Sequence, residues 1–173
     1  MPTKSMRSSS NVAESAAAVA GKTPKLKLAV QYAIKDPQAP SRTEFRKWIR
    51  SALKQDAEIV LRVVGAAEGR DLNRNFRGRD YATNVLTFVY DDAKHDARTL
   101  TGDIVLCAPV IESEASQQHK MPIAHYAHLT VHGVLHLQGY DHQTDVDAAE
   151  MERLETHIVE RLGYKDPYSG TVE

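Results

Sequence analysis

The sequence contains a single cysteine, no long hydrophobic run and almost no net charge. Cys107 is the one cysteine among 173 residues, so no disulfide forms within the chain, and a reducing, cytoplasmic compartment is expected. No apolar run approaches the ~20 residues of a membrane helix, so neither a membrane span nor a membrane partner is expected. The formal net charge is −1. Any nucleic-acid surface must therefore come from local clusters of Arg and Lys.

The length and composition are typical of one globular domain with its own core. Hydrophobic residues make up 42% of the chain and charged residues 26%. Residues 1–24 are rich in Ser and Ala without apolar periodicity, so we expect a disordered leader. Its "AAAVA" run is too short for a secretory signal, and Glu14 counts against the alternative of an organelle transit peptide. Residues 25–173 contain no repeat or linker, and we expect them to form a single domain.

The order of the elements suggests a small mixed α/β or α+β layer structure, and of the two we expect an α+β fold in which a mixed sheet of four strands packs with about five helices. Strands are expected at 25–34, 58–65, 84–90 and 103–109. Ser41 and Glu44 form a capping-box pattern ahead of a helix that continues to about residue 53. A short helix and a loop are expected within 68–80, and the pattern is helical from Pro109 onward. A central helix should run from Pro122 to Gln138, and a last one over about 145–162.

The stretch "HGVLHLQGYDH" (132–142) has the spacing of a metal site. Residues four apart lie one above the other on a helix, so His132 and His136 can bind one ion. Gly139 is suited to end the helix and return the chain, which brings His142 to the same ion. Three imidazoles leave one position of a tetrahedral Zn²⁺ open, as in catalytic sites. The sequence therefore predicts one zinc ion at the end of the central helix.

The chemistry of this site differs from that of a protease. The same spacing occurs in metzincin metalloproteases, but these have a Glu as general base directly after the first His, where this chain has Gly133. Zinc lowers the pKa of a bound water from about 15.7 towards about 7, which makes hydroxide available for other hydrolyses. The alternative is that the three histidines align by chance. His125 and His128, on the same helix, have three open interpretations: contact with the metal ligands from behind, contact with a substrate, or simple packing.

The densest basic stretch is "RDLNRNFRGR" (70–79), in which only Asp71 opposes four arginines. Guanidinium groups stabilise the negative charge that develops on a phosphate during cleavage. The four arginines are Arg70, Arg74, Arg77 and Arg79. The alternative interpretation is that they form a solvated basic surface.

The histidine motif resembles the signature of the YbeY family of bacterial zinc-dependent endoribonucleases. Two further stretches are similar to that family: "LNRNFRGRDYATNVLTF" (72–88) and "GDIVLCAPVIESEA" (102–115). The similarity covers roughly residues 26–163, with Thr87 and Arg79 as minor departures. It does not include the N-terminal leader.

This resemblance implies a function and a set of roles. His132, His136 and His142 would hold the zinc ion, and Arg77 corresponds to the family's invariant arginine and would bind the scissile phosphate. The substrate would be single-stranded RNA, chiefly ribosomal RNA. The family matures the 3′ end of small-subunit ribosomal RNA and takes part in ribosome quality control. The small ribosomal subunit and assembly factors are then the expected partners.

Two other functions fit the same motif. One is a metallohydrolase, such as a peptidase or deacylase, with a base from elsewhere in the chain; the other is a zinc-stabilised ribosome-assembly factor that binds RNA without cutting it. Asp141 could orient a ligand imidazole or lie in an exposed turn. Asn84 and Asp103 are expected to be structural, and Cys107 to be buried and inert.

Overall fold

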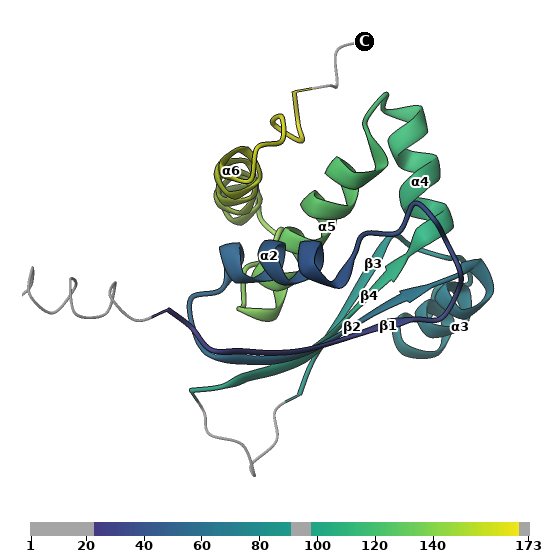
Figure 1. Cartoon of the computed structure of the whole chain (residues 1–173), viewed down its shortest axis with the longest axis horizontal. Coiled ribbons are helices and arrows are strands. Elements are labelled where there is room, and N and C mark those ends of the chain that lie inside the picture. The colour runs from purple at the N-terminus through teal and green to yellow at the C-terminus, as the bar shows by residue number, and fades with distance from the viewer. Residues whose placement is uncertain (1–22, 91–97, 170–173) are drawn as a thin grey trace, which may run out of the picture.

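The computed structural model describes residues 23–90 and 98–169, which form a four-stranded sheet with helices on both faces (Figure 1). Its strands are β1 (Leu26–Tyr32), β2 (Ala57–Val64), β3 (Val85–Val89) and β4 (Leu100–Cys107). Its helices are α2 (Arg42–Ala52), α3 (Ala66–Arg77), α4 (Ala108–Gln117), α5 (Pro122–Leu137) and α6 (Asp145–Arg161). The predicted α+β fold with a mixed sheet is confirmed.

The sheet has the order β1-β2-β4-β3. Strands β1, β2 and β4 are parallel, whereas β3 runs antiparallel to β4 and forms one edge of the sheet. Side chains alternate between the two faces along each strand. In β2, for example, Ala57, Ile59, Leu61 and Val63 are all buried on one face. That face supports the main hydrophobic core.

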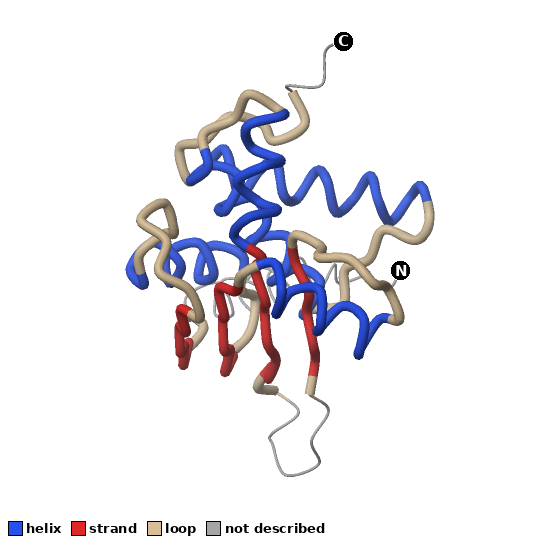
Figure 2. Tube along the Cα trace, turned by 90° about the vertical axis from the view of Figure 1, so that its right-hand side faces the viewer, coloured by secondary structure: helices blue, strands red, loops and turns tan. Residues whose placement is uncertain are grey.

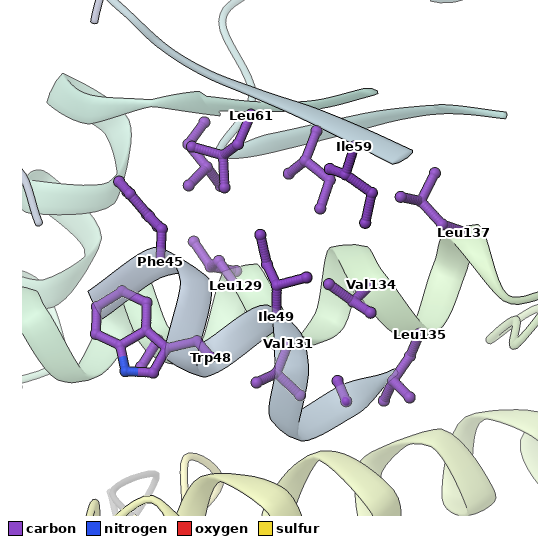
Figure 3. Close-up of a cluster of buried hydrophobic side chains, with 14 of the residues drawn as sticks. Phe45, Trp48, Ile49, Ile59, Leu61, Leu129, Val131, Val134, Leu135 and Leu137 are labelled. Carbon is purple, nitrogen blue, oxygen red and sulfur yellow. The ribbon is translucent and has the colours of Figure 1, made fainter. Parts of the chain in front are cut away.

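The main core lies between the sheet and helices α2 and α5. From α2, Phe45, Trp48 and Ile49 point inward, because apolar residues three and four apart share one helix face (Figure 3). Helix α5 contributes Val134 and Leu135. Helix α6 packs outside α5, and Figure 2 shows most of the helical residues above the four strands.

Helix α3 covers the opposite face of the sheet. Its Leu72 packs against a smaller cluster that includes Leu86, Val105 and Cys107. The helix approaches the sheet closely at Gly69, where an added Cβ would lie 2.9 Å from the Cys107 sulfur. Cys107 is buried as expected, and burial raises the pKa of its thiol. A buried, protonated thiol is a packing group and a poor nucleophile.

Most predicted element boundaries agree with the structure. The capping box is present, since Ser41 Oγ accepts from Glu44 N at 3.2 Å and the Glu44 carboxylate accepts from Ser41 N at 2.9 Å. Strand β4 begins at Leu100 rather than at residue 103, and α3 has 12 residues instead of forming a short helix. Residues 1–22 of the expected leader lie outside the described ranges, so the leader and its boundary stay predictions. No helix in the described part of the chain is long and apolar enough to cross a membrane.

Candidate metal centre

Helix α5 ends in a turn that brings the third histidine back towards the first two. Gly139 has a φ of 97°, a left-handed conformation that glycine adopts at low cost. Its N–H donates to the His136 carbonyl at 3.0 Å, and the Tyr140 N–H donates to the Leu135 carbonyl at 3.1 Å. This bond pair is a Schellman motif, which satisfies the last carbonyls of a helix. The glycine stop predicted from the sequence is therefore confirmed.

The three predicted ligands converge. Ring nitrogens of His132, His136 and His142 all lie within 4.8 Å of one another. The ring centroids are 4.7 Å apart for the first two residues, and the His142 ring is 5.0 Å from that of His136. His132 and His136 are partly buried, whereas His142 is exposed. A single divalent ion can therefore lie among the three rings with solvent at one side.

The donor set fits a borderline divalent metal such as zinc. Imidazole nitrogens are good ligands for zinc, and they must be neutral to bind it. Burial, and after it the two neighbouring imidazoles, lowers the pKa of His136, which favours the neutral form. Across residues 23–90 and 98–169, no fourth His, Cys, Asp or Glu joins the group. The arrangement leaves a coordination position that no such side chain fills, which is typical of a catalytic site.

A buried carboxylate holds the first ligand. Glu155, on α6, is fully buried and accepts hydrogen bonds from His132 Nδ1, from His128 Nε2 at 2.8 Å and from the Tyr168 hydroxyl. Burial by itself raises the pKa of this carboxyl, but the bonds from the two histidines outweigh it and hold the pKa at about 2. Glu155 is therefore ionised, and its charge is compensated by three donors.

This contact fixes which nitrogen of His132 is available to a metal. An Nδ1–H that donates to Glu155 leaves the Nε2 lone pair for the ion, and it restricts rotation of the ring. Glu155 is not among the site residues predicted from the sequence, although the sequence contains a signal for it. Glu155 lies between Met151 and Val159 on the buried stripe of α6. A carboxylate on such a stripe requires a partner.

Two residues next to the predicted ligands, Asp141 and Gly133, have turn-forming and packing roles in the structure. The Asp141 carboxylate accepts from the His142 backbone N–H at 2.7 Å, while its Oδ1 lies 3.9 Å from His142 Nδ1, beyond hydrogen-bond distance. Asp141 thus orders the turn. At Gly133, an added Cβ would lie 3.3 Å from Ile104 Cγ2 and 3.4 Å from Thr87 Cγ2. The position at which metzincins have their Glu is packed against the sheet here.

The other histidines of α5 are buried in a polar network. His125 Nε2 lies 3.0 Å from Glu114 Oε1, and the same carboxylate accepts from Asn84 Nδ2 at 3.0 Å. Asn84 Oδ1 also accepts from the next backbone N–H, so this residue joins β3 to α4 as the structural interpretation expected. His128 contacts Glu155, which connects it indirectly to the metal centre.

Arg77 lies on the other side of the edge strand from α5. It is the last residue of α3, its guanidinium donates to the Thr87 carbonyl at 2.7 Å, and it lies 5.0 Å from the centroid of the Phe88 ring. Thr87 Cγ2 in turn approaches Gly133 on α5. The structure thus links Arg77 and the histidine helix through one residue of β3 without bringing their side chains into contact.

The basic stretch is less positive than its arginine count indicated. Asp80, next in sequence, forms a two-bond ion pair with Arg70 at 2.7 and 2.9 Å, and Asp71 pairs with Arg74 at 3.0 Å. Asp71 is the one acidic residue within 70–79, but the turn after α3 also folds Asp80, the next residue, back onto the helix. Within the described ranges, Arg77 and Arg79 are left without a carboxylate partner: Arg77 bonds to backbone carbonyls and Arg79 to the Tyr81 hydroxyl.

Known proteins are similar to this chain over most of its length. The sequence profile described as Endoribonuclease YbeY matches residues 30–163. The chain is 60% identical to the endoribonuclease YbeY of Nitrosospira multiformis over 160 residues, which cover 86% of this chain and 85% of the relative. For the Nitrosomonas europaea endoribonuclease YbeY the identity is 55%, with 97% of this chain and 98% of the relative covered.

A solved structure supports the fold. The solution structure of TM1509 from Thermotoga maritima superimposes with a TM-score of 0.54 and 23% sequence identity. It covers 82% of this chain and 99% of that protein. From the profile match over most of its length and the high identity to full-length relatives, the chain belongs to the endoribonuclease YbeY family.

Proposed function

We propose that this protein is a metal-dependent endoribonuclease that cleaves single-stranded RNA with one zinc ion held by His132, His136 and His142. The observation that carries the proposal is the convergence of three ring nitrogens within 4.8 Å in a chain that belongs to an endoribonuclease family. When bound there, zinc supplies Lewis-acid polarisation of a phosphoryl oxygen and lowers the pKa of water.

The protein's own groups supply positioning and charge. Glu155 accepts from His132 Nδ1, which keeps the Nε2 lone pair of His132 available to hold a zinc ion. Arg77 is proposed to bind the scissile phosphate and to stabilise its charge in the transition state. Its guanidinium is exposed and lacks a carboxylate partner in the described part of the chain, which leaves donors for phosphate oxygens. A phosphate at the outer edge of β3 would lie between Arg77 and the histidine helix.

The substrate and partners form the finer part of the proposal. By similarity to the family, we propose that the RNA is ribosomal, that the reaction matures the 3′ end of small-subunit ribosomal RNA, and that the protein acts in ribosome quality control. The small ribosomal subunit and assembly factors would then be its partners. A single cysteine is consistent with a reducing, cytoplasmic setting.

Cleavage of a labelled single-stranded RNA by the zinc-loaded full chain tests the activity. His136→Ala should lose cleavage almost completely, because two imidazoles hold zinc poorly. Arg77→Ala should lower the rate by about 100-fold or more, the usual cost of removing a group that stabilises developing charge. Arg77→Lys should recover little, since it keeps the charge without the two-pronged donor geometry.

Arg50→Ala, an exposed arginine on α2, is the matched control and should cleave at the wild-type rate. If His136→Ala and Arg77→Ala both cleave at that rate as well, the activity does not come from this site. If the wild-type protein binds RNA and never cuts it, the non-catalytic assembly factor becomes the better description. Cleavage of a peptide library instead of RNA would favour the metallohydrolase alternative.

A further inference from the structure

A groove lies on the α3 side of the sheet, away from the main core. Its volume is about 720 Å³, within the range of small-molecule sites. Leu72 from α3 and Phe88 and Val105 from the sheet give it an apolar lining. Thr87 also lines the groove, and the Thr87 methyl approaches Gly133 on the helix that carries His132. The groove is therefore next to the edge strand that borders the metal centre.

Two aromatic side chains at this groove are exposed. Phe76 is 61% exposed and Tyr90 is 52% exposed, and both line the groove. The Phe76 and Phe88 rings form an edge-to-face contact, with centroids 5.4 Å apart and an interplanar angle of 71°. Single exposed hydrophobic residues are common, but two large aromatics at one groove indicate a binding surface.

The charged side chains that line the groove are two arginines and two carboxylates, and Arg77 is the arginine left without a carboxylate partner among the described residues. On its wall, Arg62 and Glu68 neutralise each other through a two-bond ion pair at 2.6 and 2.9 Å. Asp103 accepts a hydrogen bond from the Tyr90 hydroxyl. Arg77 is bonded only to backbone carbonyls and lies over the Phe88 ring, so its positive charge has no carboxylate partner among the described residues.

We propose that this groove binds an unpaired base of the RNA strand, stacked on Phe76, while Arg77 binds the adjoining phosphate. A flat apolar surface with an accessible cation beside it matches one nucleotide, and proteins that bind single strands combine aromatic platforms with arginines in this way. Asp103 and the Arg62–Glu68 pair offer hydrogen-bonding groups to the base edge. The inference rests on the proposed function and adds the route of the RNA: from the groove, over the edge of β3, to the histidines.

Binding of a fluorescent single-stranded RNA oligomer, measured by anisotropy, tests this. All variants carry His136→Ala, so that cleavage does not consume the probe. Phe76→Leu and Tyr90→Leu should each raise the Kd about 5- to 100-fold, because leucine keeps apolar area but cannot stack. Phe76→Tyr should bind as the parent protein does. Met121→Ala is the control, since Met121 is 70% exposed at the start of α5, outside the groove.

The outcomes separate this inference from the proposed function. If the leucine variants bind RNA as tightly as the parent at an unchanged melting temperature, the groove does not hold a base. The proposed function then stands, and a protein segment becomes the better occupant. If Phe76→Tyr fails as badly as Phe76→Leu, stacking is not the cause and the inference is wrong. If wild-type protein neither binds nor cleaves RNA, the proposed function and this inference both fail.

Discussion

At the scale of single residues, the clustering of the three histidines could be predicted from the sequence, whereas the carboxylate that contacts one of them could not. His132, His136 and His142 are separated by spacings that a helix and a glycine stop convert directly into proximity. Glu155 reaches His132 only because α6 packs on α5, a tertiary contact that no local spacing encodes. Arg77 was identified by resemblance, and its bond to the Thr87 carbonyl depends on how the sheet is ordered.

Replacing Glu155 tests its positioning role. Glu155→Gln should weaken zinc binding about 10- to 100-fold, because the group that orients His132 loses its charge. Competition of the purified protein with a chromogenic zinc chelator measures this affinity without any RNA. Glu160→Gln, an exposed carboxylate on the same helix, is the matched control and should bind zinc as wild type does. Equal affinities for both variants would show that the Glu155 contact has no part in metal binding.

The raised pKa of a second carboxyl group, that of Glu112 away from the metal centre, makes the stability of the protein depend on pH. Burial, together with the nearby carboxyl of Asp36, raises the pKa of Glu112 from its ordinary value of 4.5 to about 7. Because the folded-state pKa is the higher one, the stabilising contribution is complete below about pH 4.5. It is lost as the pH rises through about 7.

Between pH 4.5 and 8, the free energy of unfolding should therefore fall by about 1 kcal/mol more in the wild type than in Glu112→Gln. This figure is smaller than the full pKa shift implies, because the Glu112 side chain is partly exposed and solvent screens its charge. Urea denaturation at several pH values measures the difference. Glu152→Gln, which changes an exposed carboxylate, should retain the wild-type slope. A Glu112→Gln curve parallel to that of wild type would contradict the raised pKa.

At the scale of elements, the bounds of helices and strands with a strong sequence signal were predicted well, and the bounds of those without one were not. The end of α5 agrees with the sequence because Gly139 determines the turn. The start of β4 was placed too late, because Thr101 and Gly102 lack the apolar alternation of a strand although they pair with Glu58 and Ile59 of β2. Helix α3 is longer than predicted, since its polar surface shows little of the apolar stripe that faces the sheet.

Close packing between β4 and α5 gives an element-scale prediction. A Cβ on Gly102 would lie 2.7 Å from the Phe88 carbonyl oxygen and 2.8 Å from Leu137 Cδ2, so the backbone or the end of α5 must move. Gly102→Ala should lower the free energy of unfolding by about 1–3 kcal/mol. It should also weaken zinc binding, because Leu137 follows His136.

Urea denaturation and zinc competition measure the two effects. Gly133→Ala is the control, since its Cβ would meet only side-chain methyl groups, at 3.3 Å or more. It should cost less stability than Gly102→Ala. Gly102→Ala protein with wild-type stability would mean that the sheet and α5 are not in the close contact described.

At the scale of the whole molecule, the fold class could be predicted, whereas the relative placement of Arg77 and the histidines could not. The order of strands and helices was enough for a mixed α+β layer structure. Connections between two parallel strands are right-handed, which predicts the face of the sheet that the connecting helix covers. Helix α3 leads into β3, which is antiparallel to β4, so this rule does not predict the face that α3 covers. The two candidate groups consequently flank β3 from opposite faces.

The central claim is that three imidazoles bind one ion and leave a coordination position free of protein atoms. Anomalous diffraction at the zinc absorption edge from a crystal of the zinc-loaded protein tests it most directly. We expect one peak within about 2.1 Å of His132 Nε2 and of one ring nitrogen each of His136 and His142, with no other protein atom in contact. Rings that face apart, or a fourth protein ligand on the ion, would contradict the account.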